Sequence, residues 1–260
     1  MAVVLLGGSA AADHLVLKDG KRIEWKSLKD LGDRYEVETS QGRITVDKAD
    51  IDSVVVITKS PMDDKRRPAV VVDLLRIIDP SKDAVSGALK MQKNGLFMTG
   101  LENVGRVAPE DHGRFKIRYV PPEEYDLTII VERKEGLADF GVGLFGGGKQ
   151  IFFIFDAPGF WSGPCPLDGK GPEANGHGKH GRVLKTNTVV TLSFAIRKDS
   201  MAVKVDGKDF WSWQPGWERF SSSPVHFPDD PNVMFLECYQ SSFLITKMVL
   251  TGYKEAPKRP

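Results

Sequence analysis

Cysteine is scarce in this sequence, since Cys165 and Cys238 are the only two among 260 residues. Two cysteines are too few for the disulfide framework that stabilises many small secreted domains. One bridge in an oxidising compartment stays open from the sequence alone. Two separate thiols, each buried or partly exposed, are the interpretation that we favour.

An excess of charge of one sign is also missing, because 36 basic residues stand against 35 acidic ones. This balance gives no overall field that would recruit nucleic acid or an anionic membrane surface, so we expect neither as a partner. No stretch approaches the roughly 20 apolar residues that a membrane-spanning helix needs, so we expect no membrane span.

The N-terminus lacks the positive region of a complete signal peptide but keeps other features of one. A short apolar run leads to small residues that end in Ala10–Ala12, which fits the A-x-A pattern of a signal-peptidase site. We interpret residues 1–12 as the remnant of a secretory signal whose start lies upstream. The expected location is therefore periplasmic or extracellular. A disordered tail or a first strand is the alternative.

The sequence predicts no nucleotide-binding loop either, although two sequence motifs of such loops occur. The glycines from Gly141 to Gly146 read G-x-G-x-x-G, and residues 143–149 read G-x-x-x-x-G-K. Both motifs need a helix after the glycines, so that the phosphate meets a helix N-terminus. A β-branched and aromatic run at 151–155 follows instead, and Gln150 stands where the P-loop has Ser or Thr. We therefore exclude nucleotide binding.

The same stretch reads as an antiparallel hairpin, with strands at 140–145 and 150–156 and a glycine turn at 146–148. The second strand is apolar on both faces. It is therefore expected inside a sheet, with core on one face and a groove or covering loop on the other. Gly141 and Gly143 have no side chains, so we expect the face that they share to be hollow and to receive a ligand.

Catalytic motifs are missing as well, since neither the E-x-D-x-x-E run of retaining glycosidases nor a G-x-S-x-G nucleophile elbow occurs. The acidic residues within 123–126 lie at a strand entrance and alternate in direction, so a solvated strand edge is the better interpretation. His177 and His180 have H-x-x-H spacing, but they lie in a glycine-rich loop that we expect to be exposed and without zinc. We predict no catalytic residue, no metal and no cofactor.

Short alternating strands separated by tight turns fill residues 13–57. Five strands in this length predict a small open β-barrel that hides its own edges. The polar and charged stretch at 58–69 is the expected linker. The recurring pattern consists of Asp19, Gly20, Tyr35, Val37, Thr39, Gly42, Ile44, Val46 and Ile51. It resembles the small Src-homology-3-like or Sm-like barrels of bacterial exported proteins.

About ten further strands with short turns and no long helix predict a two-sheet antiparallel sandwich. We expect one short helix within 73–78 and a long loop, functional or poorly ordered, at 160–183. The apolar pattern of the last strand falls out of step near Thr246 or Lys247, which indicates a bulge there.

Four stretches of this region carry a family resemblance. They are the strand at 125–131, the hairpin that ends at Asp156, the stretch 191–213 with its V-x-V-D-G-K turn, and the closing strands at 232–253. They are similar to the concanavalin A-like (laminin G-like) jelly roll, in particular to bacterial 3-keto-disaccharide hydrolase domains. The resemblance implies an all-β chain in which a jelly-roll sandwich at 70–253 follows the small N-terminal open β-barrel, with a tail at 254–260.

Aromatic residues in this region are the candidate ligand contacts. Trp211 and Trp213 share one face of a strand, and an exposed pair of indoles would stack on sugar rings. Neighbouring aspartates would accept hydrogen bonds from sugar hydroxyls. The alternative is that the indoles belong to the core, because tryptophan is mostly buried in proteins. The candidate ligand-binding residues are Asp156, Trp161, Asp168, Asp206, Trp211 and Trp213.

The resemblance implies an extracytoplasmic, non-catalytic binding or structural module whose partner is a carbohydrate or a cell-envelope component. One alternative is a glycan-active hydrolase or lyase similar to the 3-keto-disaccharide hydrolases. Against it, no acid/base pair and no histidine can be placed on the expected concave face. The other alternative is an interaction scaffold in which the N-terminal barrel binds a protein partner.

Overall fold

The structure is a computed structural model, and it describes residues 14–19, 21–24, 27–31, 33–55, 68–100, 112–214, 216–221, 226, 230 and 233–253. The predicted signal remnant, most of the predicted linker and the predicted C-terminal tail lie outside these residues. No helix in the described ranges is long and apolar enough to cross a membrane.

The chain forms two compact units, Met1–Lys59 and Ser60–Pro260. The first unit holds two three-stranded antiparallel sheets, with orders β2-β1-β6 and β3-β4-β5. Their elements are β1 (His14–Leu17), β2 (Arg22–Glu24), β3 (Ser27–Asp30), β4 (Arg34–Thr39), β5 (Gly42–Asp47), the 3-10 helix η1 (Lys48–Asp50) and β6 (Ile51–Val55). Leu15, Val37 and Val46 form the core of this unit. No pairing that would close the two sheets into a barrel is found among the described strands, so the barrel stays a prediction.

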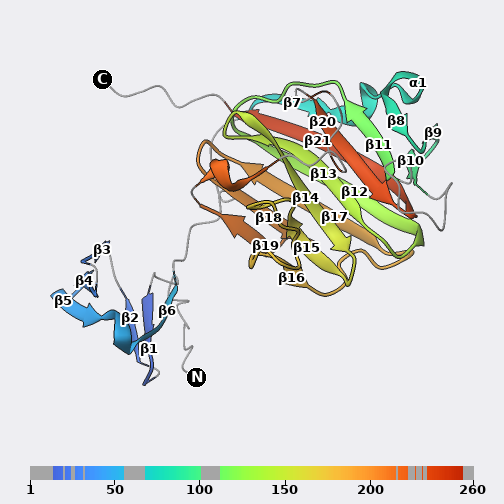
Figure 1. The fold of residues 1–260 in the computed structure, drawn as a ribbon. Coiled ribbons are helices and arrows are strands. Elements are labelled where there is room, and N and C mark those ends of the chain that lie inside the picture. The colour runs from blue at the N-terminus through green and yellow to red at the C-terminus, as the bar shows by residue number, and fades with distance from the viewer. Residues whose placement is uncertain are drawn as a thin grey trace, which may run out of the picture. The chain divides into compact units, whose positions relative to one another are not determined.

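The second unit is a sandwich of two antiparallel sheets, which confirms the predicted all-β architecture (Figure 1). One sheet has eight strands in the order β19-β18-β17-β12-β21-β10-β9, and β7 also pairs with β21. Its strands are β7 (Pro68–Asp73), β9 (Ala88–Gln92), β10 (Gly95–Thr99), β12 (Tyr125–Gly136), β17 (Val189–Ile196), β18 (Met201–Val205), β19 (Lys208–Trp213) and β21 (Ser241–Tyr253).

The facing sheet has seven strands in the order β16-β15-β14-β13-β20-β11-β8. Its strands are β8 (Ala84–Ser86), β11 (His112–Ile117), β13 (Phe140–Gly146), β14 (Lys149–Ala157), β15 (Trp161–Pro164), β16 (Lys179–His180) and β20 (Met234–Tyr239). Short helices lie between strands: η3 (Leu74–Arg76), α1 (Pro80–Asp83) and η6 (Trp217–Arg219).

The glycine-rich stretch is a hairpin, as predicted. Strands β13 and β14 pair from Phe140↔Phe155 to Gly146↔Lys149, and Gly147 and Gly148 make the turn. Both turn glycines have positive φ, 60° and 77°, a region that L side chains rarely adopt. A strand therefore follows these glycines where a nucleotide loop would need a helix.

The predicted bulge is also confirmed. Ile130 on β12 pairs with Lys247 on β21, whereas the next residue, Val131, pairs with Ile245. Thr246 is therefore the extra residue of the bulged strand, which explains why the apolar pattern changes step there.

Two sequence-based predictions differ from the structure. The expected loop at 160–183 contains strands β15 and β16, which extend the seven-stranded sheet beyond β14. The expected helix within 73–78 is a single 3-10 turn that follows β7. Strands β15 and β16 have only four and two residues, and glycine or proline lies within or beside them, so the sequence shows no strand period there. The valines at 70–72 favour a strand, and β7 extends to Asp73, the first residue of the expected helix.

Candidate functional site

The outer face of the seven-stranded sheet carries a second, smaller apolar cluster. On β14, Ile151, Phe153 and Phe155 belong to the core between the sheets. Phe152 and Ile154 point the other way and pack with Ala157, Cys165 and Phe235, because side chains alternate along a strand. The predicted arrangement of β14, with core on one face and a covered surface on the other, is therefore confirmed.

The expected hollow over Gly141 and Gly143 is filled, so this prediction is wrong. A Cβ atom added to Gly141 would lie 2.1 Å from the Phe152 ring, and one added to Gly143 would lie 2.0 Å from the Phe235 ring. The two rings stack at 5.4 Å between centroids. The missing side chains therefore make room for aromatic rings of the protein itself.

A cavity of about 530 Å³ lies on this outer face, and histidines, carboxylates and apolar groups line it together. Its lining residues are His112, Asp139, Ile154, Ala157, Pro158, Cys165, Pro166, Gly169, Gly171, Pro172, Glu173, His226 and Tyr239. Its volume is in the range of roughly 300–1,000 Å³ that small-molecule sites have. This cavity is the candidate functional site.

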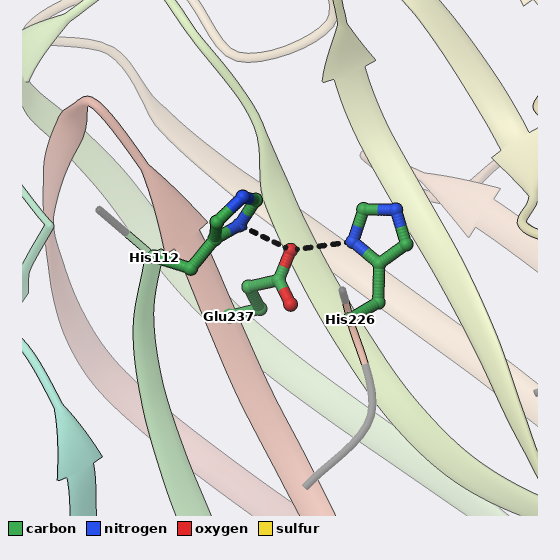
Figure 2. A group of neighbouring side chains, drawn as sticks. All are labelled: His112, His226 and Glu237. Atoms are coloured by element: carbon green, nitrogen blue, oxygen red, sulfur yellow. Dashed lines mark hydrogen bonds and ion pairs between the residues drawn. The ribbon is translucent and has the colours of Figure 1, made fainter. Parts of the chain in front are cut away.

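Glu237 connects the two histidines of the cavity (Figure 2). Its Oε1 accepts a hydrogen bond of 3.1 Å from His112 Nδ1 and one of 2.9 Å from His226 Nδ1. Glu237 is fully buried, whereas the His226 side chain is 18% exposed. The three residues form the His–Glu–His cluster, and this name is kept below.

Strand register and ring stacking hold the cluster in place. His112 begins β11 and pairs with Tyr239 on β20, and their rings stack at 4.6 Å between centroids. His226 stacks on Phe152 at 5.0 Å. Glu237 lies opposite Gly141 on β13, and the Phe152 ring, on which His226 stacks, occupies the space that a side chain of this glycine would take.

The pKa values of the cluster reflect burial and mutual attraction. Burial opposes the charge on His226, but hydrogen bonds with Cys165 and Glu237 outweigh it and raise the pKa of His226 to about 10. Burial likewise opposes the charge on Glu237, yet the hydrogen bonds from both histidines keep the pKa of Glu237 below its usual value. The carboxylate and the His226 imidazolium therefore stabilise each other.

A second buried carboxyl, Asp139, lines the cavity and is 2% exposed. Burial and the negative charge of Glu237 raise the pKa of Asp139 well above its usual value. Asp139 Oδ1 and Glu237 Oε2 have no hydrogen-bond partner among the described residues. Buried polar atoms are rarely left without a partner, so each such atom calls for an explanation.

Both cysteines are free and buried, which confirms the interpretation as separate thiols. Cys165 lies in the wall of the cavity. Cys238 lies in the core between the sheets, and burial raises its pKa well above the usual value.

The structure places Trp211 and Trp213 in the core, at 8% and 6% exposure. Their rings are stacked at 6.0 Å between centroids, as their shared strand face predicted. Trp211 packs against Phe153, and Trp213 packs against Phe220. Their burial agrees with the core alternative and not with an exposed platform for sugar rings.

Asp156 is likewise buried, because its carboxylate pairs with Arg133 at 3.0 Å. It also accepts hydrogen bonds from the backbone N–H groups of Val183 and Leu184. Asp156 borders a smaller cavity of about 280 Å³, and none of the six predicted residues lines the larger one.

The other three predicted residues also have structural partners. Asp168 pairs with Arg219, and this hydrogen bond lowers the pKa of Asp168. Asp206 stands in the turn between β18 and β19 and accepts a hydrogen bond from Thr191 N–H at 2.8 Å. Trp161, at the start of β15, packs against the His180 ring.

Sequence reasoning missed the site that the structure assembles. Its members stand at 112, 139, 226 and 237, without a motif spacing. The only local sign was Glu237 within the apolar strand β20, where a buried charge needs partners. The sequence analysis placed no histidine on the face that Phe152 and Ile154 share, whereas the structure places His112 and His226 at the cavity there.

Comparisons with known proteins identify no family for the chain. No family model matches, and no curated protein matches. Among solved structures, the apo Crh5 transglycosylase has a TM-score of 0.49 at 10% identity and covers 76% of this chain and 92% of its own. The carbohydrate binding module CBM66 from Bacillus subtilis has a TM-score of 0.41 at 9% identity, with 65% and 94% covered.

A protein of unknown function with a galectin-like fold, also from Bacillus subtilis, has a TM-score of 0.42 at 11% identity and covers 72% of this chain and 97% of its own. With TM-scores below 0.5 and about one identical residue in ten, we take neither ligand nor activity from these structures.

Proposed function

We propose that the sandwich is a non-catalytic carbohydrate-binding module and that its ligand occupies the cavity on the outer face of the seven-stranded sheet. The observation that supports this most directly is Asp139 Oδ1, a buried oxygen atom of a residue that lines this cavity, which has no hydrogen-bond partner among the described residues. A sugar hydroxyl group would donate a hydrogen bond to it.

The walls of the cavity also suit the apolar face of a sugar ring. Ile154, Ala157 and Pro158 present apolar surface, which suits the C–H face of a pyranose ring. Tyr239 also lines the cavity and adds an aromatic residue to its walls. A few fixed polar groups within apolar walls are the usual composition of a small-molecule site.

A glycan array followed by calorimetric titration of the best glycan tests this function. Asp139→Ala should weaken binding about tenfold, the size of one hydrogen bond to a charged or strongly polar group. Glu123→Ala is the matched control, because Glu123 is exposed and lines a different cavity. No glycan signal, or equal affinity of the two variants, would contradict the proposal.

A second candidate function is a glycan-active hydrolase or lyase similar to the 3-keto-disaccharide hydrolases. One observation favours it: the imidazoles of His112 and His226 line one cavity together with the carboxyl of Asp139, and the Glu237 carboxylate hydrogen-bonds to both imidazoles. These are the residue types that general acid/base catalysis needs. Incubation with 3-keto-disaccharides should then release monosaccharide, and Glu237→Gln should abolish the release. Intact substrate after prolonged incubation would contradict this second function, and the carbohydrate-binding module would stand as the proposal.

We place this function outside the cytoplasm, in the periplasm or beyond the cell. The support is the apolar N-terminal run that ends in Ala10–Ala12. Cell fractionation tests it, and a chain found only in the cytoplasm would contradict it.

A further inference from the structure

The His–Glu–His cluster has the geometry of a metal centre. One ligand atom from each of His112, His226 and Glu237 lies within 4.8 Å of the others, and Figure 2 shows the two imidazoles on either side of the carboxylate. Ligands bound at about 2.0–2.2 Å to one ion are roughly 2.8–3.6 Å apart at octahedral or tetrahedral angles. The two nitrogen–oxygen separations here, 3.1 and 2.9 Å, lie within this range.

We infer that this cluster binds a divalent first-row transition metal, with Zn²⁺ as the best match, through His112, His226 and Glu237. The histidine nitrogens that bind the ion release their protons to solvent when it binds. Two imidazole nitrogens and one carboxylate suit zinc and its neighbours, whereas calcium and magnesium prefer sites made of oxygen ligands. Three protein ligands also leave coordination positions open, which is typical of sites that hold a substrate or a water molecule.

An independent observation points to the same place. Glu237 is fully buried, yet its Oε2 has no hydrogen-bond partner among the described residues. In a purely hydrogen-bonded cluster both Nδ1–H groups use Oε1, and the second oxygen is left without a partner at a cost of about 1–3 kcal/mol. A cation on the carboxylate would engage this oxygen too, through bidentate binding.

Asp139 and the cavity complete the surroundings of the ion. Asp139 is buried beside the cluster, close enough for its charge to interact with that of Glu237, and its Oδ1 is also without a partner in the described ranges. A water molecule on the metal would donate a hydrogen bond to such an oxygen. Two adjacent hydroxyl groups of a sugar would replace water at the open positions. This last step rests on the proposed function, whereas the metal site itself does not.

The experiment uses the full chain, which is first treated with a chelator and then separated from the chelator. Zinc chloride is titrated in a calorimeter, and cobalt chloride is titrated in an absorption spectrometer. The wild type should bind one ion per chain. Mutation of a residue that only hydrogen-bonds to a metal ligand lowers metal affinity roughly 10–100-fold. His226→Ala removes a ligand itself, so it should lower the zinc affinity by more than this, and Glu237→Gln should do the same.

The matched control is the double variant His177→Ala/His180→Ala. These histidines belong to the loop of the H-x-x-H spacing, and they contact Trp213 and Trp161 rather than the cavity. This control should keep the stoichiometry and affinity of the wild type. His226 lies outside the strands of the sheet, so His226→Ala should stay folded, and near-ultraviolet circular dichroism checks this.

Two results would overturn the inference: a wild type that takes up no ion, or a folded His226→Ala variant that binds zinc as tightly as the wild type. Glycan titration with and without zinc separates the two proposals. Metal uptake without glycan binding would contradict the proposed function and support the metal site. Glycan binding that is unaffected by chelator limits the ion to a structural role.

Discussion

The contribution of a charged residue to the stability of this sandwich depends on how deeply the residue is buried. Arg133 is fully buried in the interior, where it binds Asp156, the carbonyl oxygen of Leu184 and the hydroxyl of Ser241. Asp168 and Arg219 make the same type of pair near the surface, with side chains that are 47% and 39% exposed. Removing one partner of a buried pair leaves an uncompensated charge, whereas an exposed pair is compensated by water.

We therefore expect Asp156→Ala to lower the free energy of unfolding by about 3–5 kcal/mol. Asp168→Ala should cost at most about 1 kcal/mol, after allowance for solvent. Chemical denaturation of both variants measures the difference. Equal losses would show that the Arg133 network does not stabilise the fold and would reopen a ligand-binding role for Asp156.

At the scale of elements, the β13–β14 hairpin shows why glycine occurs inside a buried strand. Gly143 lies between Phe152 on β14 and Phe235 on β20. The Phe235 ring covers the position that a side chain of Gly143 would take. The glycines of β13 therefore let two neighbouring strands close the outer face with their own rings.

Gly143→Ala should lower the free energy of unfolding by about 1–3 kcal/mol, the cost of overpacking a core. The cost should fall in a Phe235→Leu background, because the smaller side chain can move away from the new methyl group. A double-mutant cycle measured by denaturation checks this coupling. Strict additivity of the two substitutions would mean that the Phe235 ring does not occupy the space over Gly143.

At the scale of the whole molecule, the chain divides at Lys59 into two compact units. The second unit has its own core between the two sheets and contains every residue of the candidate site. Its 201 residues, from Ser60 to Pro260, are within the usual size of an independent domain.

A fragment that begins at Ser60 should therefore fold alone. Its thermal unfolding should be cooperative, and its affinity for zinc and for the best glycan should equal that of the full chain. Differential scanning calorimetry and the same titrations measure this. A fragment that aggregates or loses zinc binding would show that the first unit stabilises the site.

The sequence by itself determined the strands and their faces. Alternation with period two predicted the sandwich, both faces of β14 and the bulge at Thr246, and glycine turns predicted the β13–β14 hairpin. These features depend on residues close together in the chain, where side-chain direction and turn chemistry act locally. Short edge strands such as β15 and β16 escaped because a two- to four-residue strand has too few residues to show a period.

Only the tertiary structure decided the site. Strand pairing brings His112 and Glu237 together across 125 residues, and burial places Asp139 close enough to Glu237 for their charges to interact. The structure also buries Trp211, Trp213 and Asp156, whereas the sequence predicted them as residues that contact a ligand. Residue type and spacing do not encode solvent exposure when both faces of a sheet are covered, and that is the physical reason for the difference.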